Sequence, residues 1–385
     1  MFNILTLNKI AKVGLDRLPS DKFTCADNHA DPDGVILRSA DMHGFELGGN
    51  LKAIARAGAG TNNIPVDACA EAGIVVFNTP GANANAVKEL CLGALVLASR
   101  DVYGGMAWVQ SLQGTEEVAK AVEKGKSNYV GPELKGKKIG VLGLGAIGAP
   151  VANAAYALDM EVYGYDPFMS AESAWKLSRA VKPAPSLNFL FSECDHVSLH
   201  IPSTPDNKAQ LKEALAAAKP GLRIINMARG DLFSNDDILS ALSDGRLARY
   251  VTDFPNEGML GHKDIVCIPH LGASTPESED NCAVMAADEL QDYLVNGNIA
   301  NSVNFPNVSM AREFPHRLCV AHKNVPNILN TLTSACGVNG INIENMQNKS
   351  KKDYAYTLLD SATPFDSDAV AKLEGIEGIL RIRVL

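Results

Sequence analysis

Residues 137–166, KKIGVLGLGAIGAPVANAAYALDMEVYGYD, join an apolar run, a glycine-rich turn, a stretch of small residues and a second apolar run. Gly143, Gly145 and Gly148 have GxGxxG spacing, and Asp166 follows Gly148 by 18 residues. Glycines at these positions allow a tight turn, a close approach of the backbone to a phosphate, and close packing of a helix on a sheet. The stretch therefore predicts a strand–turn–helix–strand unit of a parallel sheet that binds a dinucleotide.

The chemistry of this turn favours one kind of dinucleotide. The backbone amides around Ala146 and Ile147, at the start of the predicted helix, offer donors and a partial positive charge to a pyrophosphate. Asp166 can accept hydrogen bonds from both ribose hydroxyls but would repel a 2′-phosphate, and no arginine follows it directly in YDPFMS. The sequence thus favours NAD over NADP. The alternative is a glycine-rich turn that binds no ligand.

The bulk properties limit the class of protein. A chain of 385 residues is expected to fold as two or three domains. Its net charge of -9 argues against a nucleic-acid partner, because phosphates need cations to neutralise them. The eight cysteines form no CxxC pair, and no HExxH or Cys/His cluster predicts a metal. The N-terminus lacks a signal layout and no apolar run approaches about 20 residues, so a soluble cytoplasmic protein without a membrane partner is expected.

The pattern of short apolar runs and helix-like segments changes near the C-terminus. Over most of the chain the two alternate, which predicts βαβ units and parallel sheets. After a connector at 302–315 the order becomes strand, helix, strand, strand, helix, strand. This βαββαβ unit of residues 314–385 predicts a small separate domain of ferredoxin-like type.

Three polar side chains follow predicted strands downstream of the glycine turn: Arg229, Glu257 and His270. Ligands of open parallel sheets bind beyond the carboxyl ends of the strands, so we expect all three on the cofactor side. Hydride transfer between an alcohol and a ketone needs a proton carrier, a cation for the substrate carboxylate and a group that tunes the carrier. Each residue alone has an ordinary explanation as a salt bridge, a solvated loop acid or a capping histidine.

Several short motifs together resemble the D-2-hydroxyacid dehydrogenase family: GLGAIG, SLHIPSTPDN, INMARGD, TDFPNE and PHLGAST, within about residues 30–305. The resemblance implies that Arg229, Glu257 and His270 are catalytic, with the histidine as acid and base. It also implies that the cofactor site includes Met227, Ala228, Asp253 and Gly272. One departure affects Glu257, because DFPNE is one residue shorter than the usual spacing.

The same resemblance implies the domain organisation. Residues 1–92 and 283–305 are expected to form a split substrate domain, and residues 93–282 an inserted NAD domain, with a cleft between them. Both are expected to be Rossmann-like α/β domains with doubly wound parallel sheets. Residues 314–385 resemble an ACT domain, and a homo-oligomer is expected through the NAD domains and paired ACT units.

The N-terminal segments ILRSADMHG, ARAGAGTNNI and FNTPGANANAVKEL resemble the phosphoglycerate-oxidising members of the family. This implies that Arg38, Ser39, Arg56 and Asn83 contact the substrate. Two arginines in an acidic chain suit a phosphate in addition to a carboxylate. The alternative is that Arg56 anchors the domain through a salt bridge.

The ACT-like segment implies a regulator. His322, Asn324 and Asn342 match the positions that hold an effector in ACT domains, which makes L-serine the expected ligand. Asn327 stands where a glycine is common, and asparagine tolerates the backbone angles of such a turn.

The expected reaction is therefore NAD-dependent oxidation of 3-phospho-D-glycerate to 3-phosphooxypyruvate, with reduction of 2-oxoglutarate as a side activity. One alternative is another D-2-hydroxy acid, such as glycerate, lactate or 2-hydroxyglutarate. A second is an NAD(H)-sensing protein on the same fold that performs no catalysis.

Overall fold

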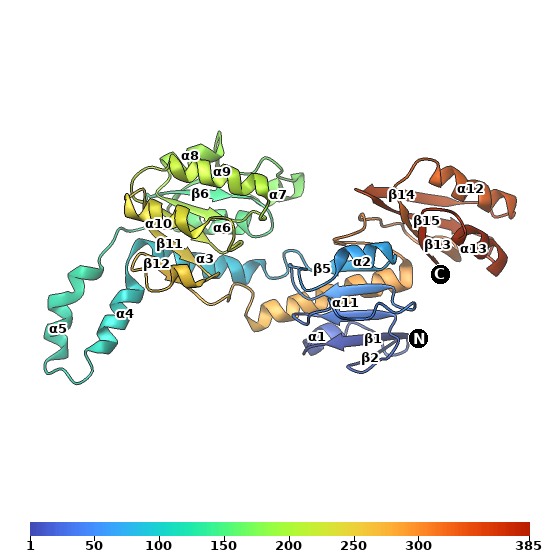
Figure 1. Cartoon of the computed structure of the whole chain (residues 1–385), viewed down its shortest axis with the longest axis horizontal. Helices are drawn as coiled ribbons and strands as arrows, with labels where there is room; N and C mark the ends of the chain where they lie inside the picture. The colour runs from blue at the N-terminus through green and yellow to red at the C-terminus, as the bar shows by residue number, and fades with distance from the viewer. The chain divides into compact units, whose positions relative to one another are not determined.

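The computed structural model describes residues 1–385 apart from the side chain of Glu172, and two compact units make up the chain (Figure 1). One unit comprises residues 1–83 and 276–385, and the other comprises residues 84–275. They contain two parallel sheets and one antiparallel sheet, so the predicted α/β fold with parallel sheets is confirmed.

The boundaries between the units differ from the predicted ones. The sequence placed them after residues 92 and 282, within two segments that the structure shows as continuous helices, α3 (Ala84–Ser99) and α11 (Pro276–Asn296). Each helix belongs as a whole to one unit, because its apolar face packs along its length on one sheet. The chain therefore crosses between units just before each helix begins.

The first unit is built around a five-stranded parallel sheet with the order β2-β1-β3-β4-β5. Its strands are β1 (Phe2–Leu7), β2 (Phe23–Ala26), β3 (Gly34–Leu37), β4 (Ala53–Arg56) and β5 (Val75–Asn78), with the helices α1 (Lys12–Leu15) and α2 (Val66–Glu71). Helix α11 packs on one face and α2 on the other. Because helices cover both faces of this sheet, all four residues of β3, GVIL, are buried. The strand therefore lacks the alternation of apolar and polar residues that a half-exposed strand shows.

The second unit is built around a seven-stranded parallel sheet with the order β12-β11-β10-β9-β6-β7-β8. The strands are β6 (Lys138–Leu142), β7 (Glu161–Tyr165), β8 (Lys182–Pro183), β9 (His196–Leu199), β10 (Leu222–Asn226), β11 (Leu247–Thr252) and β12 (Ile265–Cys267). The helices are α3, α6 (Gly148–Ala157), α7 (Ala171–Lys176), α8 (Leu187–Glu193), α9 (Pro205–Ala216) and α10 (Asn235–Ser243). Helices α3 and α6 cover one face, and α8, α9 and α10 cover the other (Figure 1).

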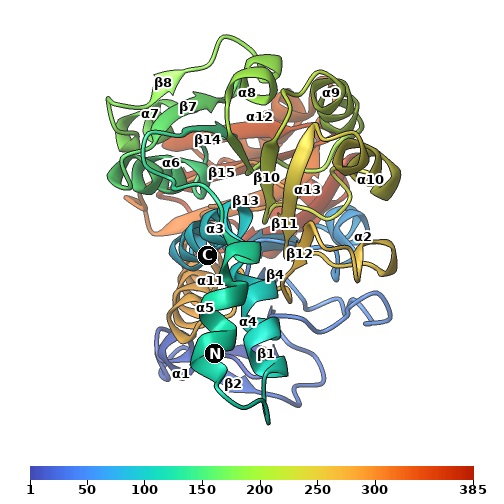
Figure 2. The same cartoon turned by 90° about the vertical axis from the view of Figure 1, so that its left-hand side faces the viewer.

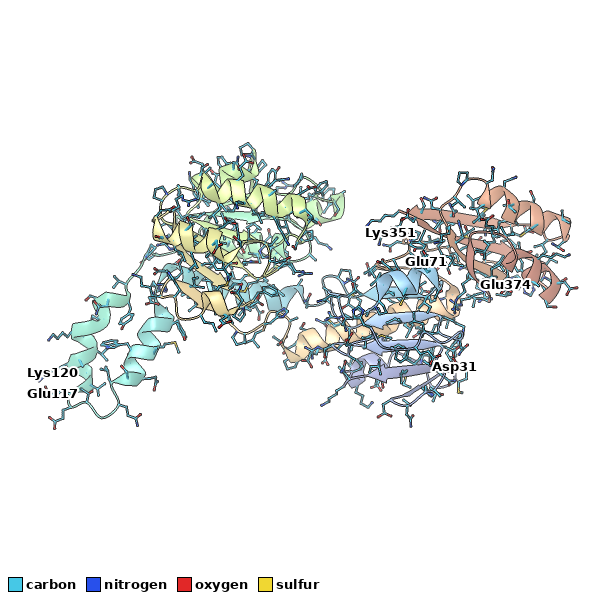
Figure 3. The ribbon with its side chains drawn as sticks, in the orientation of Figure 1. Asp31, Glu71, Glu117, Lys120, Lys351 and Glu374 are labelled. Carbon is cyan, nitrogen blue, oxygen red and sulfur yellow. The ribbon has the colours of Figure 1, made fainter. Side chains whose placement is uncertain are left out.

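A helical arm in the second unit was not predicted. The apolar segment after residue 84 breaks at Asp101, whose side chain accepts a hydrogen bond from the Gly104 amide and so caps a new helix, bent by 72° from α3. The arm consists of α4 (Val102–Ser111), α5 (Val118–Gly125) and the 3₁₀ turn η1 (Lys126–Tyr129). It extends away from the seven-stranded sheet, and Glu117 and Lys120 mark its outer end (Figures 2 and 3).

Residues 316–385 form a four-stranded antiparallel sheet with the order β14-β15-β13-β16. Its elements, in chain order, are β13 (His316–Lys323), α12 (Ile328–Val338), β14 (Asn345–Lys351), β15 (Tyr354–Ser361), α13 (Ser367–Glu374) and β16 (Ile379–Val384). This is the strand and helix order expected from the sequence. Asn327 begins α12 with a φ of 65°, so asparagine does adopt the left-handed backbone of this turn.

The antiparallel sheet shares a hydrophobic core with the first unit instead of standing apart. Helices α12 and α13 cover one of its faces. On the other face Cys319, Ala321, Tyr356 and Leu358 join the core that contains α11 and the five-stranded sheet. Glu71 and Lys351 lie where the two sheets adjoin (Figure 3), and Lys323 pairs with Glu71 at 2.5 Å between Nζ and Oε1. This shared core could not be predicted from the sequence, because the apolar residues on one face of a strand do not identify the element that packs against them.

Side chains of the antiparallel sheet complete the end of α11. The last carbonyls of a helix have no partner within it. Arg383 donates to the carbonyls of Tyr293 (3.1 Å) and Leu294 (2.7 Å), and the Tyr356 hydroxyl donates to that of Gly297 (2.8 Å). A guanidinium is favourable at this negative end of the helix dipole.

One fully buried ion pair reinforces the same place. Arg317 donates to both carboxylate oxygens of Asp360, at 2.6 and 2.8 Å, and to the carbonyl of Asn296 at 2.9 Å. Both side chains are fully excluded from solvent. Such a pair is stable only when its remaining donors are satisfied, and the helix carbonyl does this here.

No single helix is long and apolar enough to span a bilayer, although α3 and α4 meet the criterion together as a bent pair.

Helix α11 also contains a buried glutamate, Glu289, whose pKa in the folded state differs from that in the unfolded chain. Burial raises the pKa of Glu289 from 4.5 to about 8, and the only described partner of its carboxyl is the Asn301 amide, which donates to Oε1 at 2.7 Å. The folded state therefore holds a proton that the unfolded chain releases above its own, lower pKa. The contribution of Glu289 to the free energy of unfolding is therefore fully present below about pH 4.5. It is lost as the pH rises toward 8, by about 1.4 kcal/mol per pH unit.

We expect Glu289→Gln to abolish this loss, because glutamine stays neutral and can still accept the bond from Asn301. At pH 8 the variant should be more stable than the wild type, and the two should converge near pH 4, as measured by urea unfolding across this pH range. Glu46→Gln, at an exposed position, is the matched control and should follow the wild type. Parallel pH profiles for wild type and Glu289→Gln would contradict the assignment.

Candidate active site

The glycine turn connects β6 to α6 at the point where the sheet order reverses. Strand β6 lies between β9 and β7, so the chain continues to opposite sides of it, and such a point leaves a crevice at the strand ends. Gly143 has a φ of +86°, and its amide donates to the Tyr165 carbonyl at 2.9 Å, which anchors the turn to β7. Glycine adopts this positive φ without strain, and a Cβ here would lie 2.5 Å from the His200 carbonyl oxygen.

The other two glycines have different surroundings. A Cβ on Gly148 would lie 1.8 Å from the Gly143 carbonyl oxygen, so this position must be glycine for the turn to close on the helix. A Cβ on Gly145 would meet no atom within 4 Å. Open space above Gly145, beside the amides that begin α6, is the surrounding that a pyrophosphate needs.

Asp166 lies at the end of β7 beside this turn. Its Oδ2 accepts a hydrogen bond from the Leu144 amide at 2.8 Å, and its Oδ1 accepts one from the Phe168 amide at 2.9 Å. The two bonds fix the carboxylate, and each oxygen keeps a free lone pair for a ribose hydroxyl. The expected ribose acceptor is therefore held in place beside the glycine turn.

The residues that follow β10 are arranged by an asparagine that sequence reasoning missed. The buried Asn226 side chain accepts from the amides of Ala228 and Arg229, and its own amide donates to the Arg229 carbonyl and to the Tyr250 hydroxyl. This network turns the backbone after Met227 so that the Arg229 side chain is exposed. Arg229 pairs with no carboxylate among the residues described, so its guanidinium remains available to an anion. The INMAR motif contained the signal, because asparagine commonly bonds to the backbone two residues on.

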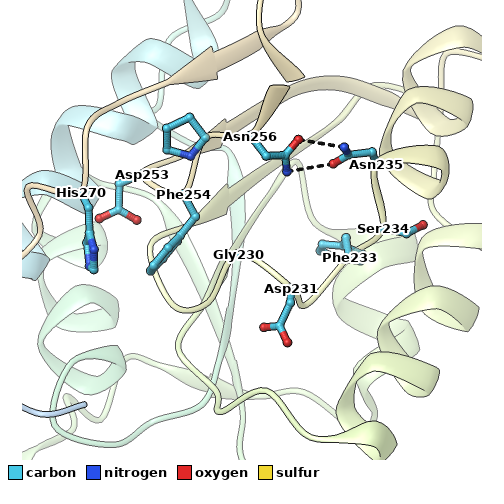
Figure 4. A pocket seen from close by; sticks show the side chains of 10 residues that line it. Gly230, Asp231, Phe233, Ser234, Asn235, Asp253, Phe254, Asn256 and His270 are labelled. Carbon is cyan, nitrogen blue, oxygen red and sulfur yellow. Dashed lines mark hydrogen bonds between the residues drawn. The ribbon is translucent and has the colours of Figure 1, made fainter. Parts of the chain in front are cut away.

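His270 lies in a pocket of about 620 Å³ at the ends of β11 and β12 (Figure 4). Its exposed ring packs against Phe254, with centroids 4.7 Å apart, and the Asp253 carboxyl lies beside it. Asp253 is buried and Oδ1 has no hydrogen-bond partner within the described chain. Burial raises the pKa of Asp253, whereas the charge of His270 and a hydrogen bond from the Gly272 backbone oppose this rise.

Glu257 does not meet His270 in this structure. It is exposed at the start of the 3₁₀ turn η2 (Glu257–Met259), does not line the pocket, and makes no ion pair among the described residues. The carboxyl that faces His270 belongs to Asp253, which the sequence assigned to the cofactor. The ring of Phe254 packs on His270, and Glu257 lies three residues further on, at the start of η2.

The expected substrate residues lie at the strand ends of the five-stranded sheet. Arg56 is the last residue of β4. Its Nε donates to the Arg38 carbonyl at 3.0 Å, so the Arg56 side chain lies against the Arg38 backbone. The Arg38 guanidinium pairs with Glu279 at 2.6 Å. The Ser39 amide donates to the Asn8 side chain, a contact that sequence reasoning missed. Asn83 Oδ1 is buried without a described partner.

The three expected effector residues are not arranged alike. His322 is buried, and its ring nitrogens contact the Thr357 hydroxyl at 2.9 Å and the Lys323 carbonyl at 2.8 Å. Asn324 donates to the Lys352 carbonyl and Asn342 to the Glu344 carboxylate, and both are exposed. Within the described chain, His322 thus has both nitrogens engaged, while the two asparagines face solvent.

Comparison with known proteins gives the family. Residues 94–272 match the NAD-binding domain of D-isomer specific 2-hydroxyacid dehydrogenases. The chain is 35% identical over 339 residues to the D-3-phosphoglycerate dehydrogenase of Haemophilus influenzae. The matched region covers 85% of this chain and 79% of that protein. It is 32% identical over 332 residues to that of Synechocystis, covering 80% of this chain and 57% of the relative.

Solved structures agree with this assignment. A cofactor (NAD⁺) bound 3-phosphoglycerate dehydrogenase of Entamoeba histolytica superposes with a TM-score of 0.61 at 26% identity, over 79% of this chain and 98% of that one. A glyoxylate reductase from Paecilomyes thermophila superposes with a TM-score of 0.65 at 23% identity, over 78% and 98%, which shows the shared fold. The glycine turn described above therefore belongs to an NAD-binding domain.

We expect Gly145→Ala to weaken NAD binding without unfolding the protein. The added methyl group meets no protein atom but enters the space assigned to the pyrophosphate. NADH fluorescence titration should show an affinity at least about tenfold lower, equivalent to about 1.4 kcal/mol. The comparison variant Gly148→Ala should instead lose stability, and an unchanged NADH affinity in Gly145→Ala would remove this turn from the phosphate site.

Proposed function

Because the chain belongs to the D-isomer specific 2-hydroxyacid dehydrogenases and is an NAD-dependent dehydrogenase, we propose that it oxidises 3-phospho-D-glycerate to 3-phosphooxypyruvate, the first step of serine biosynthesis. The relatives support the substrate: proteins named D-3-phosphoglycerate dehydrogenase match most of the chain, including that of Escherichia coli at 31% identity over 343 residues. The observation that carries the chemistry is His270, exposed in its pocket beside the Asp253 carboxyl.

The proton is handled by His270. The imidazole accepts the proton of the C2 hydroxyl as the C2–H bond breaks and the C2 carbonyl forms. NAD supplies the acceptor for the hydride that leaves C2. The carboxyl of Asp253 beside the ring favours the imidazolium that results, and contact with Phe254 fixes the plane of the ring.

Arg229 holds the substrate carboxylate in this proposal. A guanidinium can donate two parallel hydrogen bonds to a carboxylate, which fixes its orientation. The Asn226 network sets the backbone of Arg229, and the absence of a described carboxylate partner leaves the donors available. Met227, Ala228 and Gly272 then provide backbone close to the cofactor.

We assign the phosphate to Arg38 and Arg56. The Arg56 Nε donates to the Arg38 carbonyl at the ends of β3 and β4, and the Arg38 guanidinium, which is paired here with Glu279, would exchange this carboxylate for the phosphate. Ser39 adds a polar group after β3, and Asn83 adds one in the turn before α3. Asn83 has a buried oxygen without a described partner, which a substrate hydroxyl could satisfy.

A homo-oligomer fits the exposed face of the arm. Tyr103, Met106 and Val109 of α4 and Val118 of α5 are large apolar side chains exposed to solvent. Stacking of Trp108 on Tyr129, with centroids 5.2 Å apart, holds the arm together but does not cover them. An apolar face of this kind is typical of an interface with a second copy.

We expect His270→Ala to lower kcat by about 10²–10⁴-fold while NADH affinity stays close to that of the wild type. The ring moves a proton but does not hold the nucleotide, so steady-state kinetics and NADH titration should separate the two effects.

Asp253→Asn should lower kcat more than Glu257→Gln, because Asp253 is the acid beside the ring. A larger effect of Glu257→Gln would return this role to Glu257, and full turnover in His270→Ala would exclude the proposed proton transfer.

The substrate is tested by NADH formation from 3-phosphoglycerate and from unphosphorylated glycerate. We expect the phosphorylated acid to have the higher kcat/KM, and Arg56→Ala to raise KM for it by about tenfold or more with a smaller effect on glycerate. Lys12→Ala, which removes an exposed cation of the same unit, is the matched control. Equal effects on both acids would remove Arg56 from the phosphate site, and preference for glycerate would replace the proposed substrate.

We further propose L-serine as an effector of residues 316–385, at Asn324 and Asn342. The exposed amides suit a carboxylate and an ammonium group, whereas His322 serves the sheet through its two hydrogen bonds. Increasing L-serine should inhibit the wild type, and Asn342→Ala should raise the concentration for half inhibition at least about tenfold. Absence of inhibition of the wild type would leave the sheet without an effector role.

A further inference from the structure

A second cavity, of about 420 Å³, lies where the antiparallel sheet adjoins the five-stranded sheet. None of the residues assigned above to substrate, NAD or serine lines it. The lining consists of Gly49, Asn50 and Lys52, which precede β4, Glu374 at the end of α13, and residues 379–383 of β16. Its walls thus come from two sheets that are distant in the sequence.

Two guanidinium groups of β16 face the five-stranded sheet. Arg381 and Arg383 pair in register with Ala321 and Cys319, which join the core on that side, whereas Ile382 between them packs with α12 and α13. Arg381 donates to the Leu51 carbonyl at 2.6 Å, and Arg383 donates to the end of α11 and lies 4.4 Å from the Tyr293 ring. Their side chains therefore leave β16 toward the cavity and its floor.

Neither guanidinium has an anionic partner in the part of the chain that the structure describes. Both make hydrogen bonds to carbonyls, and no ion pair joins either to a carboxylate. Burial and the charge of Arg383 lower the pKa of Arg381, which reflects the cost of placing two cations together away from water. Arg383 already has carbonyl acceptors at the negative end of α11, so the guanidinium that an anion would stabilise is that of Arg381.

The other charged groups of the lining do not supply this counter-ion. Lys52 is itself paired with Asp33 at 2.6 Å and donates to Asn50, so its charge and donors are used. Glu374, labelled in Figure 3, is an exposed residue of the cavity lining and makes no described ion pair. Gly49 and Asn50 line the cavity, and their amides donate to no protein acceptor within the described chain, so they are available as further donors.

We propose that this cavity binds a small oxyanion, a carboxylate or a phosphate group, through Arg381 and the amides of Gly49 and Asn50. Arg381 keeps several of its five donors free, and a planar guanidinium matches both groups with two parallel bonds. Arg383 strengthens the site by its charge. The bound anion joins β16 to the segment before β4 and thereby ties the antiparallel sheet to the five-stranded sheet.

The site is tested by the shift of the melting temperature with inorganic phosphate or malonate, against sodium chloride at equal ionic strength. All proteins carry Arg56→Ala, so that the proposed substrate site does not contribute. The parent should show a saturable increase, and Arg381→Met should weaken the apparent affinity at least about tenfold. Glu374→Gln should strengthen it, because a negative charge of the cavity lining is removed without disturbing the packing between the sheets. Arg17→Met, which removes an exposed arginine paired with Asp288 in the same unit, should bind as the parent does.

A selenate soak gives the location independently of stability. An anomalous peak beside the Arg381 guanidinium, absent in crystals of Arg381→Met, is expected. The relative affinities for phosphate and malonate then identify which oxyanion the site prefers. No saturable shift with either anion, equal binding by Arg381→Met, or a selenate peak only elsewhere would each overturn the proposal.

Discussion

The parallel direction of all seven strands in the second unit is the constraint on which its chemistry depends. Parallel strands bring their carboxyl ends to one edge, so side chains separated by more than a hundred residues meet there. Gly143 follows β6, Asp166 follows β7, Arg229 follows β10 and Asp253 follows β11. Helices bury both faces of the sheet and hold the strands in position. The polar groups therefore lie in the loops that follow the strand ends.

Those parts of the fold and of the candidate site that depend on a local sequence pattern could be predicted from the sequence. The GxGxxG spacing marks a strand–turn–helix, and the structure gives each glycine a distinct steric reason. The βαββαβ order of residues 316–385 follows from alternation of short apolar runs. Pro276 and Gly297 delimit α11, since proline suits the first turn of a helix and Gly297, with a φ of +77°, suits the position after its last turn.

The remainder depends on contacts that no local pattern contains. The motifs assigned Glu257 as the acid beside the histidine, but in the fold Asp253 lines the pocket of His270 and Glu257 does not. Asn226 and Asn8 organise backbone turns through side-chain bonds that asparagine makes in many loops without functional meaning. The arm was missed because α3 and α4 share one apolar composition, and only the cap by Asp101 separates them.

The completion of α11 by the antiparallel sheet has a consequence for how such proteins can change. A module that folds on its own can be deleted or replaced by recombination as a cassette. Here the carbonyls of Tyr293, Leu294 and Gly297 depend on donors from residues 356 and 383, and the two parts share one hydrophobic core. Exchange of residues 316–385 between homologues would therefore have to preserve the donors at residues 356 and 383 and the apolar face that packs on α11.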